Sequence, residues 1–306
     1  MRYVNDIREL IGSTPLIKLN NMGIKPGINV FAKLECFNPG GSVKDRIGAA
    51  MLEREEKAGR LVPGSTIVEA TAGNTGLGVA IAALNKGYRV IFVVPEKFSV
   101  EKQVLMRALG AEIINTPKEK GMKGATEKAQ ELLASINNSI SLQQFENEQN
   151  PLIHYETTGP EIYIDLEGKV DYFVAGAGSG GTFTGIARYL KEQDDRIKAV
   201  LADPEGSTMG GGKEGCYLME GIGNNFIPGT MDMGLVDGVI KVNDNEAFTM
   251  SRELAMKEGL IVGSSSGAAM AAVMKLVQRI PSGNIVTVFP DRGDRYFSKG
   301  LYDFPI

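Results

Sequence analysis

Apolar, β-branched segments alternate with helix-like segments along most of the chain, and this alternation limits the possible folds more than any other feature. Strand patterns are predicted at residues 66–69, 88–94, 111–115, 172–175, 199–202 and 284–289. Helical patterns are predicted at residues 77–85, 99–109, 124–136, 183–192, 245–258 and 267–279. The alternation predicts an α/β protein with mostly parallel sheets covered by helices on both faces.

Length and charge exclude several functional classes. The chain has 306 residues, enough for two lobes, and its net charge of −4 with no basic stripe argues against nucleic-acid binding. No apolar stretch is long enough to span a bilayer, and the first ten residues lack the apolar core of a signal peptide. We therefore expect a cytoplasmic protein with neither a membrane nor a nucleic-acid partner.

Cysteine and histidine are scarce, which limits metal and triad chemistry. Cys36 and Cys216 form no CxxC pattern, so neither a disulfide framework nor a structural zinc site is expected. His154 is the only histidine, and its segment has the pattern of a helix start without a nucleophile motif. We interpret His154 as structural, expect no metal site, and assign any acid–base chemistry to other side chains.

The segment Asn38–Arg46 places a lysine at the start of a predicted helix. One proline and two glycines form a tight turn before Lys44, and a helical pattern follows it. The positive end of the helix dipole and Arg46 both disfavour an ammonium ion there, which favours the neutral amine that a Schiff base requires. A solvated lysine is the simpler interpretation of this segment taken alone.

Residues 71–76, with the sequence TAGNTG, follow a predicted strand directly and open a predicted helix. Backbone amides at a helix start, with the hydroxyls of Thr71 and Thr75 beside them, form a site suited to a carboxylate. Asn74 adds an amide that can donate a hydrogen bond to a phenolate. A helix cap without any ligand is the simpler alternative.

Residues 176–185, with the sequence GAGSGGTFTG, form a glycine-rich turn between a predicted strand and a predicted helix. Glycines let the backbone approach a ligand closely, and Ser179, Thr182 and Thr184 supply hydroxyls. The segment therefore predicts a phosphate-binding turn.

The same turn also matches a dinucleotide pattern. Gly176-x-Gly178-x-x-Gly181 has the required spacing, and Asp203 ends the next predicted strand as a ribose-binding acid would. An NAD-dependent dehydrogenase is therefore a distant alternative. It leaves the two earlier segments without a role, and the additional hydroxyls suit a phosphomonoester better.

Residues 263–267, with the sequence GSSSG, join a strand-like segment to a helix of small residues. A serine hydroxyl there can bond to a pyridine nitrogen without fully protonating it. Such a pyridine is a weaker electron sink and favours chemistry at the β-carbon of an amino acid. A helix cap is again the simpler alternative.

These four segments, in this order, resemble the fold-type-II pyridoxal-phosphate enzymes of the cysteine synthase and cystathionine β-synthase family. The resemblance extends from IGSTPLIKLN near the start to FPDRGDRYFSKGLY near the end. It implies two three-layer α/β/α lobes of the tryptophan synthase β type, with pyridoxal 5′-phosphate in the cleft between them. The implied smaller, mobile lobe is 40–147, which carries the substrate-carboxylate segment, and the larger lobe is 1–39 plus 148–306.

The resemblance also implies a role for individual residues. Lys44 would form the Schiff base and serve as catalytic base. The other implied cofactor contacts are Asn74 at the 3′-oxygen, Ser265 at the pyridine nitrogen and, at the phosphate, Gly178, Ser179, Gly180, Gly181 and Thr182. The implied ligands of the substrate carboxylate are Thr71, Ala72, Thr75 and Gln143. Residues 221–223, with the sequence GIG, would belong to a loop over the site mouth.

Some details depart from the commonest cysteine synthase pattern. That family usually has TSGNTG where this chain has TAGNTG, so Ala72 keeps the backbone amide but lacks a hydroxyl. The segments NPGGSVKDR and DPEGS are more similar to the short bacterial cystathionine β-synthases. The haem region and regulatory domains of the animal enzyme are not expected.

The implied reaction is β-replacement or β-elimination on a small L-amino acid (L-cysteine, L-serine or O-acetyl-L-serine) through an α-aminoacrylate. Homocysteine, sulfide or cysteine as the thiol acceptor would give cystathionine, cysteine or lanthionine, and cysteine as donor would release hydrogen sulfide. Water is an alternative acceptor, giving L-serine from L-cysteine, and Asp232 is the candidate base for it. A backbone-capping Asp232 is the simpler interpretation. The family also implies a homodimer.

Overall fold

A computed structural model describes residues 3–96 and 98–303 of the chain. The chain divides into two compact units, one formed by Met1–Ile11 with Asn38–Gln149 and the other by Gly12–Phe37 with Asn150–Ile306. We expected residues 1–39 to group with the larger unit, but the first eleven group with the smaller one. The Arg8 guanidinium, which donates to the Ala82 carbonyl oxygen at 3.3 Å, helps to hold them there.

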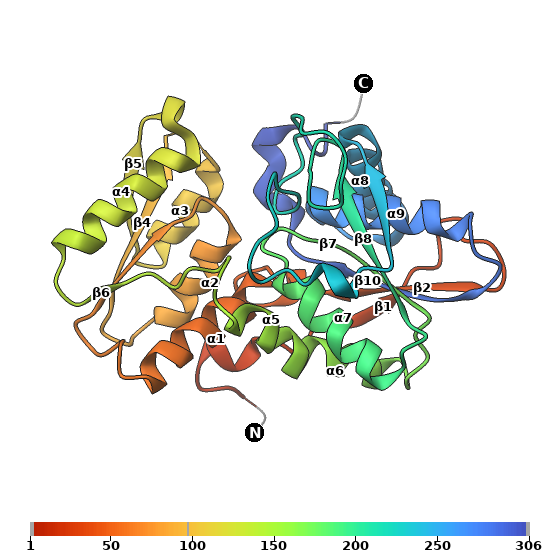
Figure 1. Cartoon of the computed structure of the whole chain (residues 1–306), viewed down its shortest axis with the longest axis horizontal. Coiled ribbons are helices and arrows are strands. Elements are labelled where there is room, and N and C mark those ends of the chain that lie inside the picture. The colour runs from red at the N-terminus through yellow and green to blue at the C-terminus, as the bar shows by residue number, and fades with distance from the viewer. Residues whose placement is uncertain (1–2, 97, 304–306) are drawn as a thin grey trace. The chain divides into compact units, whose positions relative to one another are not determined.

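The smaller unit is built on a four-stranded parallel sheet with the order β5-β4-β3-β6. Its strands are β3 (Thr66–Ala70), β4 (Arg89–Pro95), β5 (Glu112–Thr116) and β6 (Ser139–Ile140). Its long helices are α1 (Lys44–Lys57), α2 (Asn74–Ala83), α3 (Val100–Ala108) and α4 (Gly121–Ser135). Helix α4 covers one face of the sheet, and α2 and α3 lie on the other (Figure 1). Because both faces are covered, β4 is apolar along nearly its whole length.

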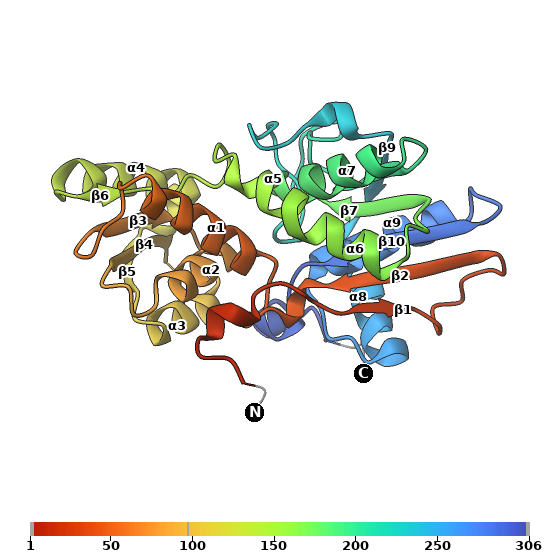
Figure 2. The same ribbon diagram turned by 90° about the horizontal axis from the view of Figure 1, so that it is seen from below.

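The larger unit is built on a six-stranded sheet with the order β1-β2-β10-β7-β8-β9, parallel except for β1. Its strands are β1 (Leu16–Lys18), β2 (Ile28–Leu34), β7 (Tyr172–Gly176), β8 (Lys198–Pro204), β9 (Gly238–Val242) and β10 (Gly283–Phe289). Its helices are α5 (Gln149–Ile153), α6 (Gly159–Asp165), α7 (Gly181–Gln193), α8 (Asp244–Glu258) and α9 (Ser264–Val277), with a π-helical segment at His154–Thr158. Figure 2 shows α6 and α7 on one face of this sheet and α8 and α9 on the other.

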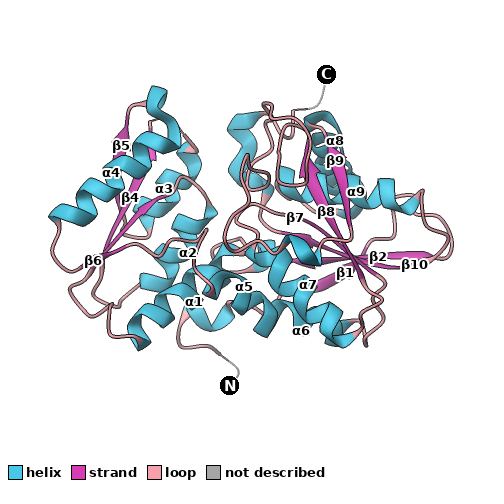
Figure 3. Cartoon of the chain, viewed as in Figure 1, coloured by secondary structure: helices cyan, strands magenta, loops and turns pink. Residues whose placement is uncertain are grey.

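Two buried clusters, one on each face of the larger sheet, hold these layers together. Residues 205–237 join β8 to β9 as a long loop interrupted by one short 3-10 turn (Figure 3). Hydrogen bonds tie this loop together, because the amide of Thr208 and the hydroxyl of Ser207 both donate to the carbonyl oxygen of Asn224. Among the residues that the structure describes, no helix is long and apolar enough to cross a membrane.

Candidate active site

Lys44 is the first residue of α1, and its turn is fixed from both sides. The backbone amide of Gly40 donates to the carboxylate of Asp45, and the amide of Lys44 donates to the Ser42 hydroxyl at 3.2 Å. A Cβ atom at Gly78 would lie 2.2 Å from the Lys44 carbonyl oxygen, so glycine lets the start of α1 rest directly on α2. The predicted lysine therefore lies beside the helix that the TAGNTG segment opens.

The TAGNTG segment lies between the end of β3 and the first turn of α2. Thr71, Ala72 and Thr75 are buried, and Asn74 is the first residue of the helix. Gly73 is the N-cap residue, and no side chain caps the helix. A Cβ atom added at Gly73 would meet nothing within 4 Å. The segment thus offers uncapped amides and hydroxyls beside open space.

Gln144, and not the predicted Gln143, is the glutamine beside this segment. The Thr75 hydroxyl donates to Oε1 of Gln144 at 2.6 Å. Gln143 has a left-handed backbone with φ of +53°, and its side chain is exposed. This turn directs two adjacent glutamines to different surroundings, and no sequence pattern separates them.

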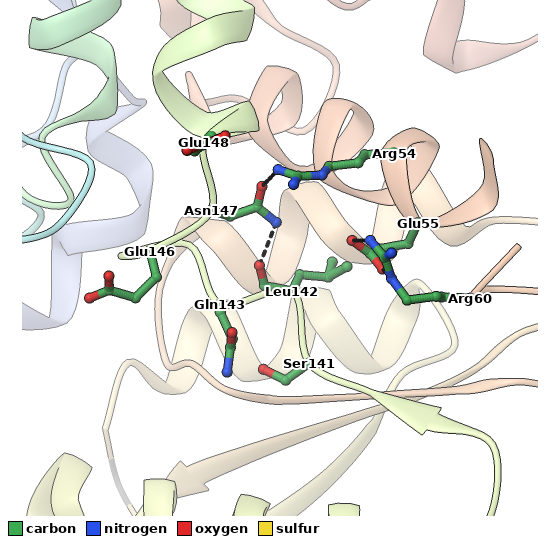
Figure 4. Close-up of a pocket in the computed structure, with 9 residues that line it drawn as sticks. All are labelled: Arg54, Glu55, Arg60, Ser141, Leu142, Gln143, Glu146, Asn147 and Glu148. Atoms are coloured by element: carbon green, nitrogen blue, oxygen red, sulfur yellow. Dashed lines mark hydrogen bonds and ion pairs between the residues drawn. The ribbon is translucent and has the colours of Figure 1, made fainter. Parts of the chain in front are cut away.

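Gln143 instead lines a polar pocket of about 450 Å³ in the smaller unit (Figure 4). Its wall is formed by the end of α1 and by the segment after β6, namely Arg54, Glu55, Arg60, Ser141, Leu142, Gln143, Glu146, Asn147 and Glu148. Within the wall Arg60 pairs with Glu55, and Arg54 donates a hydrogen bond to Asn147. Gln143 therefore lines this pocket, whereas the Thr75 hydroxyl bonds to Gln144.

The glycine-rich turn of the larger unit ends in helix α7, whose N-cap residue Gly180 has a φ of +89°. No side chain caps α7, so its first amides are available to an anion. The Ser179 hydroxyl accepts a hydrogen bond from Asn150 at 2.8 Å, and the Thr182 hydroxyl lies 3.1 Å from Nε2 of His154. His154 is fully buried, and its Nδ1 lies 2.8 Å from the Thr158 hydroxyl. The only histidine thus supports the predicted phosphate turn from behind, in the structural role expected for it.

Each predicted glycine of this turn is enclosed by protein atoms. A Cβ atom would lie 2.3 Å from the carbonyl oxygen of Gly221 at Gly178, and 2.4 Å from Cβ of Met231 at Gly180. At Gly181 it would lie 2.1 Å from Oδ1 of Asn150. Glycine is therefore required at these three positions by packing, whatever ligand binds.

The GIG stretch and its neighbour Glu220 contact both the glycine-rich turn before α7 and the first turn of α9, which begins at Ser264. The amide of Gly223 donates to the Ala177 carbonyl oxygen at 2.7 Å, and Ile222 is buried against Gly176. The amide of Glu220 donates to the Ser264 hydroxyl at 3.2 Å. Ser265, the next residue of α9, is also buried. This stretch belongs to the long loop between β8 and β9, and its position over the site mouth stays a prediction.

Asp232 occupies a capping position. Its Oδ1 accepts the amide of Gly234 at 2.9 Å, and its Oδ2 lies 3.5 Å from the Arg188 guanidinium. The side chain is 44% exposed, which leaves the carboxylate solvated. The geometry favours the simpler interpretation of Asp232, as a cap of a short 3-10 turn, over the role of catalytic base.

The Asp203 carboxylate bonds to other residues of the protein, which removes the support for a dinucleotide site. It is 1% exposed, and its Oδ2 accepts from Nζ of Lys241 at 2.5 Å and from the amide of Gly210 at 3.0 Å. The carboxylate closes the start of the long loop and has no geometry for binding a ribose. The dehydrogenase alternative is therefore not supported.

The donor set fits pyridoxal phosphate. The larger unit offers a dianion the uncapped start of α7 with Ser179 and Thr182, and it offers a pyridine nitrogen the serines at the start of α9. The smaller unit offers Lys44, whose backbone packs on Gly78 of the helix that Asn74 opens. In the part of the chain that the structure describes, no group of three His, Cys, Asp or Glu side chains is placed to hold a metal ion.

Comparison with known sequences identifies the family of the chain. The sequence model of the family described as "Pyridoxal-phosphate dependent enzyme" matches residues 7–291, and the chain belongs to that family. Its fold is the tryptophan synthase β-like fold type II, as the sequence predicts.

Three relatives narrow the class. An O-acetylserine dependent cystathionine beta-synthase of Bacillus subtilis is 49% identical over 99% of both chains. A cysteine synthase of Helicobacter pylori is 48% identical over 99% of this chain and 100% of that protein. The crystal structure of a hydrogen sulfide-producing enzyme from Fusobacterium nucleatum has a TM-score of 0.91 and 40% identity, covering 96% of this chain and all of that one. The chain is thus a pyridoxal-phosphate-dependent enzyme of the cysteine synthase and cystathionine β-synthase type.

Proposed function

We propose that this enzyme uses O-acetyl-L-serine as donor and L-homocysteine as acceptor and forms L-cystathionine and acetate. The carbon–oxygen bond at the β-carbon breaks, and acetate departs with the electron pair. The thiol sulfur forms the new bond to the β-carbon and gives up its proton. The observation that carries this choice is the near full-length identity of 49% with a relative named for that reaction.

Residues of both units would hold the cofactor. Lys44 would bind it covalently through Nζ, Asn74 would donate to its 3′-oxygen, and Ser265 would face its pyridine nitrogen. The amides and hydroxyls of residues 178–182 would bind its phosphate. Bound pyridoxal phosphate withdraws electrons from the α-carbon of the amino acid, so that the α-proton becomes acidic and the β-substituent can leave.

Lys44 is the proposed proton carrier of the reaction. Its Nζ would take the proton from the α-carbon of the amino acid and later return it. The close packing of Lys44 on Gly78 fixes the backbone from which this side chain extends. A fixed backbone keeps the amine within reach of a single proton position.

The proposed site of the substrate carboxylate is the start of α2. Thr71 and Thr75 would donate through their hydroxyls, Ala72 through its amide, and Gln144 through its side-chain amide. The bond from Thr75 to Oε1 of Gln144 holds the Gln144 side chain beside the start of α2. The open space beside Gly73 gives the substrate room.

L-cysteine as donor, with release of hydrogen sulfide, is the second candidate. The Fusobacterium nucleatum enzyme, named for hydrogen sulfide production, shares 40% of its sequence with this chain. Water as acceptor would require a base at the β-carbon. Because Asp232 caps a turn and faces Arg188, this variant of the reaction has less support.

Titration of the purified enzyme with donors tests the proposal. O-acetyl-L-serine should change the visible absorption of the bound cofactor at lower concentration than L-serine or L-cysteine. Homocysteine should then restore the original spectrum with formation of cystathionine. A spectrum that responds to L-cysteine alone, with sulfide released, would replace the first candidate by the second.

The assembly and location of the enzyme are proposals by family resemblance. We propose a homodimer that acts in the cytoplasm. Light scattering at micromolar concentration should give twice the mass of the chain. A monomeric mass with full activity would contradict the dimer.

A further inference from the structure

Glu69 lies near the end of β3, two residues before the TAGNTG segment. One atom of its carboxylate, Oε1, accepts three hydrogen bonds from consecutive residues of another segment. The Ser141 hydroxyl donates at 3.0 Å, the amide of Leu142 also donates, and the amide of Gln143 donates at 3.3 Å. A carboxylate with three donors on one oxygen fixes the position of that segment.

These bonds begin where the sheet ends. Strand β6 pairs with β3 only through Ser139 and Ile140, and the next three residues have no strand partner at this edge. The Glu69 carboxylate receives the donors of residues 141–143 in place of a backbone carbonyl. The chain can then enter a turn at Gln143 with a φ of +53°, a conformation that L-residues adopt only when the surroundings hold it.

A second set of contacts closes this turn from the other side (Figure 4). The Asn147 side chain donates to the Leu142 carbonyl oxygen at 2.8 Å, and the Arg54 guanidinium donates to Oδ1 of Asn147 at 3.2 Å. The amide of Asn147 also donates to the Gln143 carbonyl oxygen at 3.0 Å. Between these anchors lies Gln144, which meets Thr75.

We propose that Glu69 is a positioning residue for donor binding, because it sets the turn at residues 141–147 that presents Gln144 to the substrate carboxylate. The inference rests on the proposed function, since it gives Gln144 a ligand. Glu69 itself does not touch the substrate. Burial raises the pKa of the Glu69 carboxyl above its ordinary value, although the three donors act in the opposite direction.

The test compares two substitutions of Glu69. Glu69→Leu removes every acceptor at nearly constant volume, so the KM for O-acetyl-L-serine should rise at least about tenfold while kcat stays within about threefold. Glu69→Gln keeps one acceptor oxygen, replaces the other by an amide NH2 group and removes the charge, so its KM should stay within about threefold of wild type. Glu112→Leu is the control, because Glu112 pairs with Arg89 on the exposed edge of the same unit.

Three kinetic results would overturn the inference. The first is an unchanged KM in Glu69→Leu, and the second is a loss of kcat alone in that variant. The third is a KM in Glu69→Gln that rises as much as in Glu69→Leu. The absorption of the bound cofactor should be unchanged in all three variants. Glu69 bonds to residues 141–143 and Glu112 pairs with Arg89, and none of these partners is proposed to bind the cofactor.

Hydrogen exchange supplies a readout that does not depend on turnover. In the enzyme without substrate, Glu69→Leu should speed exchange of the amides in peptide 141–147, and Glu112→Leu should leave that peptide unchanged. If Glu69→Leu does not fold, Ser141→Ala removes one of the three donors and should give the same change in smaller measure. Unaltered exchange in these variants would overturn the inference. If the wild-type enzyme consumed no O-acetyl-L-serine, the proposed function would fail while this exchange result would still stand.

Discussion

Two helices that follow parallel strands, α2 in the smaller unit and α7 in the larger, begin alike and differ in what surrounds them. Both have a glycine at the N-cap and no side-chain cap. Around α7 the glycines are enclosed by Met231, Asn150 and Gly221, whereas the space beside Gly73 at α2 is open. The enclosed turn of α7 fits its proposed role of holding a cofactor that stays bound. The open turn of α2 fits its proposed role of receiving a substrate that enters and leaves.

The largest expected effect concerns Lys44, the residue of the smaller unit that we propose as the proton carrier. Lys44→Ala should lower kcat/KM for O-acetyl-L-serine by at least about 10³-fold, because the proton carrier is lost. Steady-state assays of cystathionine formation measure it. Lys57→Ala, at the exposed end of the same helix, is the control. Turnover within about tenfold of wild type would remove Lys44 from the mechanism.

The enclosed turn predicts the next largest effect. Gly178→Ala would bring a Cβ atom to 2.3 Å from the Gly221 carbonyl oxygen, so the turn must shift. We expect cofactor affinity to fall at least about tenfold and the free energy of unfolding to fall by about 1–3 kcal/mol. Cofactor absorption after dialysis and denaturant unfolding measure the two quantities. Gly238→Ala, where the added Cβ meets nothing, is the matched control in the same unit.

The open turn predicts a different pattern for the corresponding substitution. Gly73→Ala adds a methyl group where there is space and where φ is −114°, so the free energy of unfolding should fall by no more than about 1 kcal/mol, the cost of alanine at an N-cap. The methyl group should nevertheless occupy part of the substrate's space and raise the donor KM about tenfold. Equal losses of stability in Gly73→Ala and Gly178→Ala would break the comparison between the two turns.

The smallest effect concerns the two thiols, both in the larger unit. Burial, with the Asp291 carboxylate nearby, raises the pKa of the Cys36 thiol from its ordinary 9.0 to about 12, whereas Cys216 is exposed. A thiol reagent at pH 8 should therefore modify one cysteine in the native enzyme and both in denaturant. Because the raised pKa belongs to the folded state, Cys36 favours folding below pH 9, and this contribution disappears as the pH rises from 9 to 12. Rapid native labelling of both thiols would contradict the assignment.

Much of the fold could be predicted because buried parallel strands are apolar along their length and punctuated by helices. Strand β2 escaped prediction because it contains Lys33, a lysine only 1% exposed. That ammonium donates to the Thr14 carbonyl oxygen at 2.7 Å and pairs with Glu161 at 2.9 Å. Partners so distant in sequence cannot be inferred from a local hydrophobic pattern.

The features of the candidate site also fall into two groups, those that a local sequence pattern predicts and those that distant contacts decide. Motifs that depend on glycine and on helix starts could be predicted, because their backbone requirements are written in adjacent residues. The choice between Gln143 and Gln144 depends on a single left-handed residue, and the pairing of Asp232 with Arg188 depends on the neighbouring helix α7. The role inferred for Glu69 required knowing where β6 ends. Each of these is decided by tertiary contacts.

The buried position of His154 has a practical consequence. Since the chain contains one histidine, every imidazole resonance in an NMR spectrum of the enzyme comes from a ring 3.1 Å from the Thr182 hydroxyl. The native protein therefore carries an unlabelled, single-site reporter immediately behind its phosphate turn, and binding of inorganic phosphate or of the cofactor could be followed there without introducing any probe.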